Sequence, residues 1–356
     1  MIKSGDYYEY QGCIHIHTTY SDGTKSLEEA AQIASDVGLD YILVSDHMTL
    51  ESRHAGKEGF YGKTLATIGY EHNDTDDINH YLLFETKDVL PANLTPQEYV
   101  TEGKRQGALG IIAHPDEIRP RDGKYPSYPW TAWDADGFDG IEIWNQMSEW
   151  MEKLTPYNRL KMLFSPRKFM KAPTDRILMK WDEFNKEKKV AGLGAIDVHG
   201  YPYRLGPLRI TIFPYKVQYR SLRTHLILTE ELSRDLEAAK KQLFDAIRDC
   251  RLFVSNFRWG DASGFIFTAA RGSEKVIAGG KIDDFNDTVI TVRTPASARI
   301  KLIGNSRTLL EINGDSLEYK PQKNGLYRVE VLKNGKGWIY SNHITVSYTH
   351  LTLPTN

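Results

Sequence analysis

The sequence predicts an α/β protein in which strands and helices alternate, followed by a small antiparallel β-sandwich. Two observations carry this prediction. Up to about residue 200, short apolar runs alternate with amphipathic segments, as in parallel βαβ units. From about residue 262 to residue 346, short alternating segments are separated by Gly, Asn and Asp turns. We therefore expect one domain at residues 1–260 and a second at residues 261–346.

The composition is that of an ordinary globular protein. The chain has 356 residues, of which 40% are hydrophobic and 26% charged, so it is long enough for two domains. A formal net charge of -2 gives no reason to expect a nucleic-acid partner. Two cysteines argue against a disulfide framework and against thiolate metal sites. The lack of a signal-peptide core or a membrane-length apolar run predicts a cytoplasmic protein without a membrane partner.

The first strand–helix–strand unit occupies residues 13–47. Its opening strand alternates apolar side chains with His15 and His17, which places both imidazoles on one side before a Ser-Asp-Gly turn. A capping box formed by Ser26 and Glu29 begins a helix that ends at Gly38. A continuous apolar strand follows and ends at Asp46 and His47. Such a unit is typical of a parallel sheet, whose functional residues lie at the carboxyl ends of the strands.

The same alternation continues along the chain. A second capping box, at Thr95 to Glu98, begins a helix that reaches about Gly107. Further helices are expected over most of residues 147–189 and at 232–250. Further strands are expected at residues 67–70, 81–84, 109–113, 140–145, 190–196, 224–228 and 251–255.

Histidines and carboxylates gather where the expected strands begin or end. A lone His-x-His pair favours two hydrogen-bonded core histidines, but nine such donors favour a site for several metal ions. Asp22 has an alternative as a plain turn residue. The nine candidate ligands are His15, His17, Asp22, His47, Glu71, His80, His114, Asp197 and His199.

This ordered set of motifs resembles the polymerase-and-histidinol-phosphatase (PHP) superfamily of metal-dependent hydrolases over about the first two hundred residues. The resemblance implies a distorted seven-stranded β/α barrel with a trinuclear site at its carboxyl-end rim. The strands at 224–228 and 251–255 are expected to complete that barrel. Three further motifs resemble the CehA/McbA-type branch: Phe213-Pro214-Tyr215, Arg223-Thr224-His225 and Trp338-Ile339-Tyr340-Ser341-Asn342.

The family scheme, carried over residue by residue, implies three ion positions. The first would be held by His15, His17, Glu71 and Asp197. Glu71 would bridge to a second ion, completed by His80 and His114. The third would take Asp22, His47 and His199. Asp46, beside His47, is expected to orient an imidazole through its free N–H.

The expected chemistry is hydrolysis of an ester. Two or three zinc, manganese or iron ions would make hydroxide available near pH 7 and favour a small anionic substrate. A phosphomonoesterase or phosphodiesterase is the leading hypothesis. Carboxylic or carbamate ester hydrolysis is the alternative, and a non-catalytic binding protein the third. Asp46, Glu71 and Asp197 are the candidate catalytic residues, with a metal-bound water or protonated Asp46 as general acid.

Substrate contacts are expected from cations and amides near the strand ends, although surface charge or packing explains these side chains equally well. The candidates are Arg119, Arg204 and Asn145, with Arg121, Lys124, Arg209 and Glu142 as further possibilities. The last ten residues, 347–356, follow the final strand without cap or turn logic. We expect them to be a non-native tail.

Overall fold

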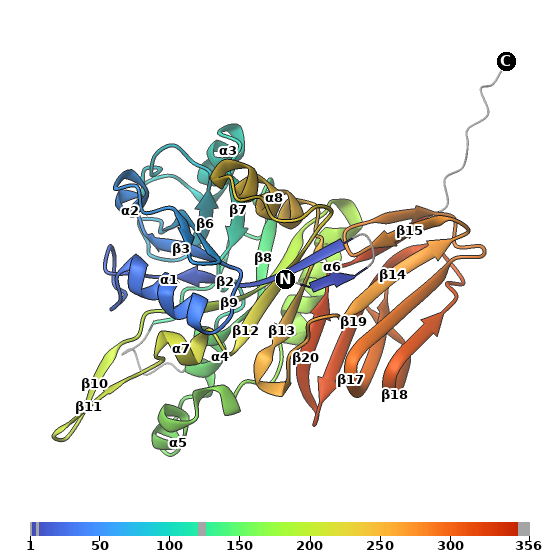
Figure 1. The fold of residues 1–356 in the computed structure, drawn as a ribbon. Helices are drawn as coiled ribbons and strands as arrows, with labels where there is room; N and C mark the ends of the chain where they lie inside the picture. Colours follow the sequence, from blue (N-terminus) through green and yellow to red (C-terminus); the bar gives the residue numbers. More distant parts are fainter. Residues whose placement is uncertain (1, 5–6, 120–125, 348–356) are drawn as a thin grey trace.

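The computed structural model describes residues 2–4, 7–119 and 126–347. Its amino-terminal part is a barrel whose last strand pairs back onto its first, as Figure 1 shows from one side. In order around the barrel, the strands are β2 (Tyr7–Ile16), β3 (Tyr41–His47), β5 (Thr64–His72), β6 (Tyr81–Phe84), β7 (Leu109–Ile112), β8 (Gly140–Asn145) and β9 (Ala191–Val198). The expected barrel of seven strands is present.

The barrel departs from a regular β/α alternation at β6. This strand runs antiparallel to both of its neighbours, whereas the other five pairs around the barrel are parallel. A short connection of about eight residues, 73–80, joins β5 to β6 directly, so no crossover helix fits between them. A strict seven-fold β/α repeat is therefore not what the chain forms.

The strands expected to complete the barrel lie outside it. β9 already pairs with β2 through Ala195 and Val198, which closes the ring. β12 (Leu222–Leu228) pairs antiparallel with the earlier half of β2, and β13 (Leu252–Asn256) pairs with β12. These two strands extend the sheet away from the barrel instead. The remaining short strands of this part are β1 (Ile2–Ser4), β4 (Gly59–Tyr61), β10 (Pro202–Leu205) and β11 (Leu208–Thr211).

Both expected capping boxes are present, at Ser26 and Thr95. The expected long helical stretch at 147–189 forms three separate helices, because prolines at 156, 166 and 173 interrupt it. The helices are α1 (Leu27–Asp36), α2 (Glu51–His54), α3 (Pro96–Arg105), α4 (Gln146–Lys153), α5 (Arg159–Phe164), α6 (Asp175–Glu187), α7 (Tyr215–Gln218) and α8 (Leu236–Arg248), with 3-10 turns at Pro166–Lys168 and Phe257–Trp259.

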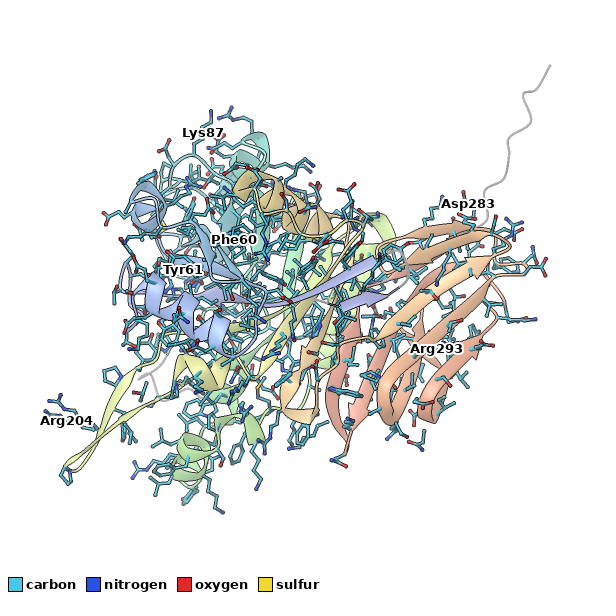
Figure 2. The ribbon with its side chains drawn as sticks, viewed as in Figure 1. Phe60, Tyr61, Lys87, Arg204, Asp283 and Arg293 are labelled. Carbon is cyan, nitrogen blue, oxygen red and sulfur yellow. The ribbon has the colours of Figure 1, made fainter. Side chains whose placement is uncertain are left out.

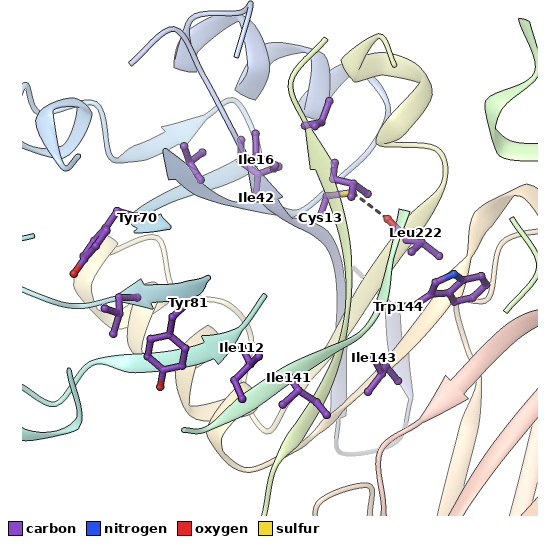
Figure 3. Close-up of a cluster of buried hydrophobic side chains, with 14 of the residues drawn as sticks. Cys13, Ile16, Ile42, Tyr70, Tyr81, Ile112, Ile141, Ile143, Trp144 and Leu222 are labelled. Carbon is purple, nitrogen blue, oxygen red and sulfur yellow. Dashed lines mark hydrogen bonds between the residues drawn. The ribbon is translucent and has the colours of Figure 1, made fainter. Parts of the chain in front are cut away.

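Two apolar layers hold the barrel together. Alternate side chains of the strands pack outward against α1, α3 and α6, and Figure 3 shows part of this outer layer, including Cys13 and Ile112. The other strand side chains, among them Ile14 and Leu193, form the inner layer, which continues onto α8 and β12. This inner layer fills one end of the barrel, so polar side chains can gather only at the opposite end.

The carboxyl-terminal part is rich in β-structure and has its own apolar core. Its strand pairs are antiparallel except for β16 with β21, which is parallel and was not expected. Strand β20 pairs with β13 of the first part, so one continuous sheet contains strands from both sides of the expected boundary at residue 260. The strands are β14 (Ile266–Arg271), β15 (Glu274–Ile277), β16 (Lys281–Asp283), β17 (Val289–Gly304), β18 (Arg307–Tyr319), β19 (Gly325–Lys333), β20 (Lys336–Ser341) and β21 (Ile344–Ser347).

Side chains complete the hydrogen bonding of β9 before that strand reaches β2. The amide of Asn342 accepts from Gly192 N and donates to Gly192 O, both at 2.9 Å. The hydroxyl of Thr224 accepts from Gly194 N at 3.1 Å and donates to Gly194 O at 3.0 Å. Both side chains are fully buried. Thr224 and Asn342 belong to two of the three motifs that resemble the CehA/McbA-type branch. Their side chains thus make the hydrogen bonds that a neighbouring strand would otherwise make to this part of β9.

Asn342→Ala is expected to lower the free energy of unfolding by about 2 to 4 kcal/mol, because it leaves a buried N–H and a buried C=O of Gly192 without partners. Urea unfolding measures the change. The control is Asn313→Ala, on the exposed side of β18. Equal effects of the two substitutions would show that the amide of Asn342 is not needed to satisfy β9.

The expected tail at 347–356 lies outside the described residues, except for Ser347. That residue ends β21 and faces Asp283 of β16, so the expected start of the tail is one residue early. No helix within the described ranges has both the length and the apolar character that a membrane crossing requires.

Candidate metal centre

Nine polar side chains meet at the end of the barrel that the inner apolar layer leaves free. They come from the ends of β2, β3, β5 and β9, from the turn after β2, from the residue just before β6 and from the residues just after β7. Their nitrogen and oxygen atoms form four overlapping groups, within each of which the atoms lie within 4.8 Å of one another. All nine side chains singled out in the sequence belong to these groups.

Glu71, only 1% exposed, lies at the centre. Its Oε2 is 2.9 Å from His15 Nε2, 3.2 Å from His17 Nε2 and 3.3 Å from His47 Nδ1. Its Oε1 is 2.8 Å from His80 Nδ1 and 3.1 Å from His114 Nε2. The two oxygens of one carboxylate therefore face two different sets of imidazoles, which is the arrangement of a bridging ligand.

Two further carboxylates complete the groups. Asp197 Oδ1 lies 3.5 Å from His15 Nε2 and 3.4 Å from His17 Nε2. Asp22 Oδ1 lies 3.3 Å from His199 Nε2 and 3.8 Å from His47 Nε2. Asp22 thus points into the cluster, although its position in a turn left that open. His17 contacts both Asp22 and Glu71, so it belongs to the group around each of these two carboxylates.

The backbone is strained at three of the nine positions. His15, His114 and Asp197 have φ angles of 65°, 27° and 49°, in the left-handed region that residues other than glycine rarely adopt. At His15 the pairing of β2 with both neighbours shifts by one residue, which marks a bulge. Because of this bulge Ile14 faces the inner layer and Ile16 the outer layer, where strict alternation would place them together.

His17 provides a test of whether the cluster fits metal ions. Its imidazole is fully buried, and within the described structure carboxylate oxygens lie 3.2 to 3.7 Å from its ring nitrogens without forming a well-aligned hydrogen bond. A buried polar atom that makes no well-aligned hydrogen bond is costly, so such atoms call for a ligand. Neutral imidazoles and carboxylates are the donors that zinc, iron and manganese take. The donor set therefore fits divalent metal ions.

The charges of the cluster depend strongly on one another. Burial lowers the pKa of His17, but the adjacent Asp197 and Glu71 outweigh it and bring that pKa to about 9. Burial likewise opposes the effect of Glu71 and Asp77 at His80, whose pKa rises to about 10. Burial raises the pKa of Glu71 and Asp197, but the surrounding imidazoles hold both well below the usual range. Without metal, protonated imidazoles balance ionised carboxylates.

Glu142 supports the cluster from behind. Its Oε1 is 2.7 Å from His15 Nδ1, and its Oε2 accepts from the backbone N–H of His114 at 2.7 Å and from Asn145 Nδ2 at 2.8 Å. This leaves His15 Nε2 free to face Glu71. The Oδ1 of Asn145 accepts from Ser148 N and caps α4. Both ends of Asn145 are thus engaged within the protein, and a contact between Asn145 and substrate stays a prediction.

Glu142→Gln is expected to weaken metal binding about 10- to 100-fold, because Glu142 orients the ligands His15 and His114. An amide has one acceptor oxygen, whereas both oxygens of Glu142 accept, so one donor must face an NH2 group. Competition with a coloured chelator measures the affinity. Glu183→Gln, on the exposed face of α6, is the control. Equal affinities of the two variants would contradict the positioning role.

The expected role of Asp46 is wrong, because its carboxylate does not contact an imidazole. It accepts from the backbone N–H of Thr18 at 2.6 Å, from Thr18 Oγ1 at 2.7 Å and from Ser21 Oγ at 2.7 Å. Asp46 thus fixes the turn that carries Asp22. All three partners donate, which also leaves its use as a general acid without support.

The predicted cationic contacts have different locations. The guanidinium of Arg119 lies 5.3 Å from the centre of the Tyr128 ring and pairs with Glu117. Figure 2 shows Arg204 on the projecting β10–β11 hairpin, away from the barrel. Arg209 faces Arg204 on the same hairpin. Arg121 and Lys124 lie outside the described residues. Of these cations, Arg119 is the one beside an aromatic ring of the site.

Two tyrosines border the cluster without having been anticipated. Tyr128 stacks on His80 with ring centres 5.0 Å apart. Tyr201 stacks on His199 at 4.8 Å and donates its hydroxyl to Asp22 Oδ2 at 3.0 Å. Tyr201 follows His199 by two residues, a spacing that could have signalled a shared side. Tyr128 lies far from any ligand motif, and we find no sequence signal for it.

Three other buried histidines of the described ranges lie outside the cluster. His72 packs against Tyr99 with ring centres 4.5 Å apart, on the side of β5 away from the cluster, and burial lowers its pKa to about 4. His225 contacts Glu9 and Ser255, and His343 contacts Asp182.

No protein-family model and no curated protein matches the sequence. Among solved structures, a two-domain protein from Bacteroides vulgatus containing a predicted PHP-like metal-dependent phosphoesterase is 15% identical, with 95% of this chain and 96% of that chain covered and a TM-score of 0.45. A protein from Bifidobacterium adolescentis, provisionally a metal-dependent phosphoesterase, is 18% identical over 56% of this chain and 92% of its own, with a TM-score of 0.34. An amidohydrolase from Chromobacterium violaceum, with bound sulfate and no metal, is 12% identical over 58% of this chain and 96% of its own, with a TM-score of 0.30.

Proposed function

We propose that this chain is a PHP-type metal-dependent hydrolase that cleaves an ester bond. One observation carries the proposal: the two oxygens of the buried Glu71 face two sets of imidazoles, His15 with His17 on one side and His80 with His114 on the other. A single carboxylate between two sets of nitrogen donors suits a pair of metal ions.

The nine residues would hold metal ions at the three positions that the family scheme implies. His15, His17, Glu71 and Asp197 would hold one ion, while His80 and His114 would complete a second with Glu71. Asp22, His47 and His199 would hold a third. Bound divalent ions would lower the pKa of water toward about 7 and polarise the bond to be cleaved. Glu142 keeps His15 and the backbone of His114 in place, and Asp46 keeps the turn of Asp22 in place.

An anionic phosphomonoester or phosphodiester is the substrate that we favour. Three carboxylates among the nine donors would leave a positive excess with three divalent ions, and such a site attracts anions. Arg119, beside Tyr128 at the border of the cluster, would contact the substrate anion. The finer assignment to the CehA/McbA branch rests on three sequence motifs. In one of them Tyr215 donates its hydroxyl to the backbone carbonyl of His17 at 2.7 Å, which suits a role in shaping the site.

The test is metal analysis of the purified chain, followed by a panel of nitrophenyl phosphates, bis(nitrophenyl) phosphate, nitrophenyl carboxylates and carbamates. We expect two or three divalent ions per chain and faster cleavage of the phosphate esters. The reaction should stop with a chelator and return when metal is added.

The panel separates the alternatives. Preference for carboxylic or carbamate esters would replace the phosphoesterase assignment and keep the hydrolase. Stoichiometric metal without cleavage of any ester would favour a binding protein and overturn the enzymatic proposal.

A further inference from the structure

Apolar side chains are unusually exposed on and around α5. Tyr157 is 98% exposed, Leu160 51% and Phe164 67%. These residues are spaced by three and four positions, so Leu160 and Phe164 share one side of the helix and Tyr157 precedes it. Met162 on the opposite side is fully buried, in a cluster with Trp150 and Phe213. The helix is therefore anchored to the protein, and its exposed apolar side is a property of its surface.

Cations surround this apolar side. Residues 154–174 contain no Asp or Glu, but they contain Arg159, Lys161, Arg167, Lys168 and Lys171. Among the described residues, none of these five cations has a carboxylate oxygen within 4.0 Å of its side-chain nitrogens, whereas ion pairs are common elsewhere on the surface. We call the exposed side chains of residues 157–171 the α5 surface.

More cations from distant parts of the chain lie close to the α5 surface. Burial lowers the pKa of Arg167, and the nearby positive charges of Arg258 and Arg220 lower it further. Burial also lowers the pKa of Lys336, with added repulsion from Arg258, Lys171 and Lys153 that Glu149 partly offsets. The contacts show the same proximity, because Lys336 Nζ donates to Lys168 O at 2.9 Å and Arg167 Nη1 donates to Arg220 O at 2.8 Å. Cations from separate parts of the chain therefore lie together here, and a partner of negative charge would relieve their repulsion.

The α5 surface is hollowed between its apolar and basic side chains. The hollow is lined by Leu160, Lys161, Phe164, Ser165, Lys168 and Phe169. It offers ammonium groups and a hydroxyl for a phosphate, together with aromatic and aliphatic walls for a hydrocarbon chain. Such a mixture of Lys with Phe and Leu is typical of protein surfaces that lie in the headgroup region of a membrane.

The β10–β11 hairpin projects beside this surface. Ile212 and Phe213, which follow β11, pack in the same apolar cluster as Met162 of α5. Figure 1 shows α5 and the hairpin on the same side of the barrel. Tyr203 on the hairpin is 40% exposed, and the chain from 200 to 229 contains no Asp or Glu. The hairpin therefore extends the basic and apolar character toward Tyr201, which borders the metal centre.

We propose that the α5 surface and the β10–β11 hairpin bind an anionic phospholipid membrane surface. Leu160 and Phe164 enter the headgroup region, and the lysines contact lipid phosphates. This inference differs from the sequence-based expectation of no membrane partner, which considered only segments that span a bilayer. It is independent of the reaction catalysed at the metal centre.

Nucleic acid is the weaker candidate for this surface. A polyanion would satisfy the cations, but it leaves the aliphatic side chain of Leu160 and the hollow beside it without a role. A membrane surface satisfies both the charge and the apolar side chains at once, because binding there grows with buried apolar area and with attraction to anionic lipid.

The test uses the full chain and co-sedimentation with vesicles of phosphatidylcholine alone or mixed with phosphatidylserine. We expect binding to the mixed vesicles only, weakened by salt. Each cation near an anionic bilayer strengthens binding about fivefold, so Lys161→Gln with Lys168→Gln is expected to lower it about 25-fold. Leu160→Ser with Phe164→Ser should also abolish most binding. Lys186→Gln with Lys189→Gln is the control with the same change in charge, because both lysines are exposed at the far end of α6, one in its last turn and one just after it.

Circular dichroism and cleavage of a soluble ester show that each variant is folded. Several results would overturn the proposal: no binding to mixed vesicles, equal binding to both kinds of vesicle, or equal loss in the control variant. Tighter binding to a single-stranded oligonucleotide than to the vesicles would assign the surface to nucleic acid. A doubled mass in solution that the Leu160 and Phe164 substitutions reverse would assign it to a second copy of the chain.

Discussion

Glu71→Gln is expected to lower kcat/KM by about 10³-fold or more and to remove metal from the protein. The carboxylate of Glu71 is buried and faces imidazoles through both oxygens. An amide keeps the size of the side chain but loses its negative charge. Only its oxygen can still bind a metal ion or accept a hydrogen bond, whereas its NH2 group cannot. Metal content by mass spectrometry and ester cleavage by absorbance are the two measurements.

His72→Gln is the matched control for this substitution. His72 is the next residue of β5, is equally buried and packs outward against Tyr99. Its replacement can lower stability but should leave the metal content unchanged. Full activity of Glu71→Gln with any ester would show that the bridging role assigned to Glu71 is wrong.

The ligand positions could be predicted because the chemistry is concentrated at strand ends. His47, Glu71 and His114 each come at the end of a short apolar run, and parallel strands bring their carboxyl ends to one rim. A local pattern with a known period was thus enough to predict which side chains meet. Asp22 was less secure for the opposite reason, since it lies in a turn whose direction depends on Asp46, 24 residues later in the chain.

The supporting contacts could not be predicted in the same way. The bulge at His15 and the left-handed backbone of His114 and Asp197 are imposed by their neighbours in space, and no residue type marks them. Glu142 and Asn145 look like any polar pair in a strand, but they connect His15, His114 and the start of α4. Pattern and spacing predict which elements form, whereas contacts between distant elements decide their details.

The same distinction applies to the fold. Both capping boxes predicted a helix start correctly, because the stabilising contacts lie within four residues. The prediction of which strands close the barrel was wrong. The barrel closes because β9 pairs with β2, which lies nearly two hundred residues earlier in the chain. An apolar strand does not carry the identity of its partner in its own sequence. The antiparallel direction of β6 was missed for that reason too.

Filling of the metal centre is expected to strengthen by about 10³-fold for each pH unit between about pH 6 and 8, because ligands must be deprotonated. In the metal-free protein the pKa is about 9 for His17 and about 10 for His80. Burial lowers the pKa of His15, but Glu71, Asp197 and Glu142 outweigh it and hold that pKa well above its usual value, so all three imidazoles carry a proton in this range. Three protons must therefore leave when the centre fills. A pH indicator in weakly buffered protein measures them directly. An affinity that is independent of pH in this range would show that these imidazoles are already neutral.

The stability of the metal-free protein follows from the same shifts with the opposite sign. The folded pKa of His17 lies above its unfolded value of about 6.5, so its contribution is complete below about pH 6.5 and is lost as the pH rises toward 9. That contribution is on the order of 3 kcal/mol. Glu71 and Asp197 have lowered pKa values, so their contributions are present above about pH 4 to 4.5 and are lost in acid. Metal-free protein should therefore be most stable between about pH 5 and 6.5. Metal ions bind the neutral imidazoles, so the metal-loaded protein should not lose stability as the pH rises toward about 9. Thermal unfolding of metal-free and metal-loaded protein from pH 5 to about 9 tests this, and parallel curves would contradict it.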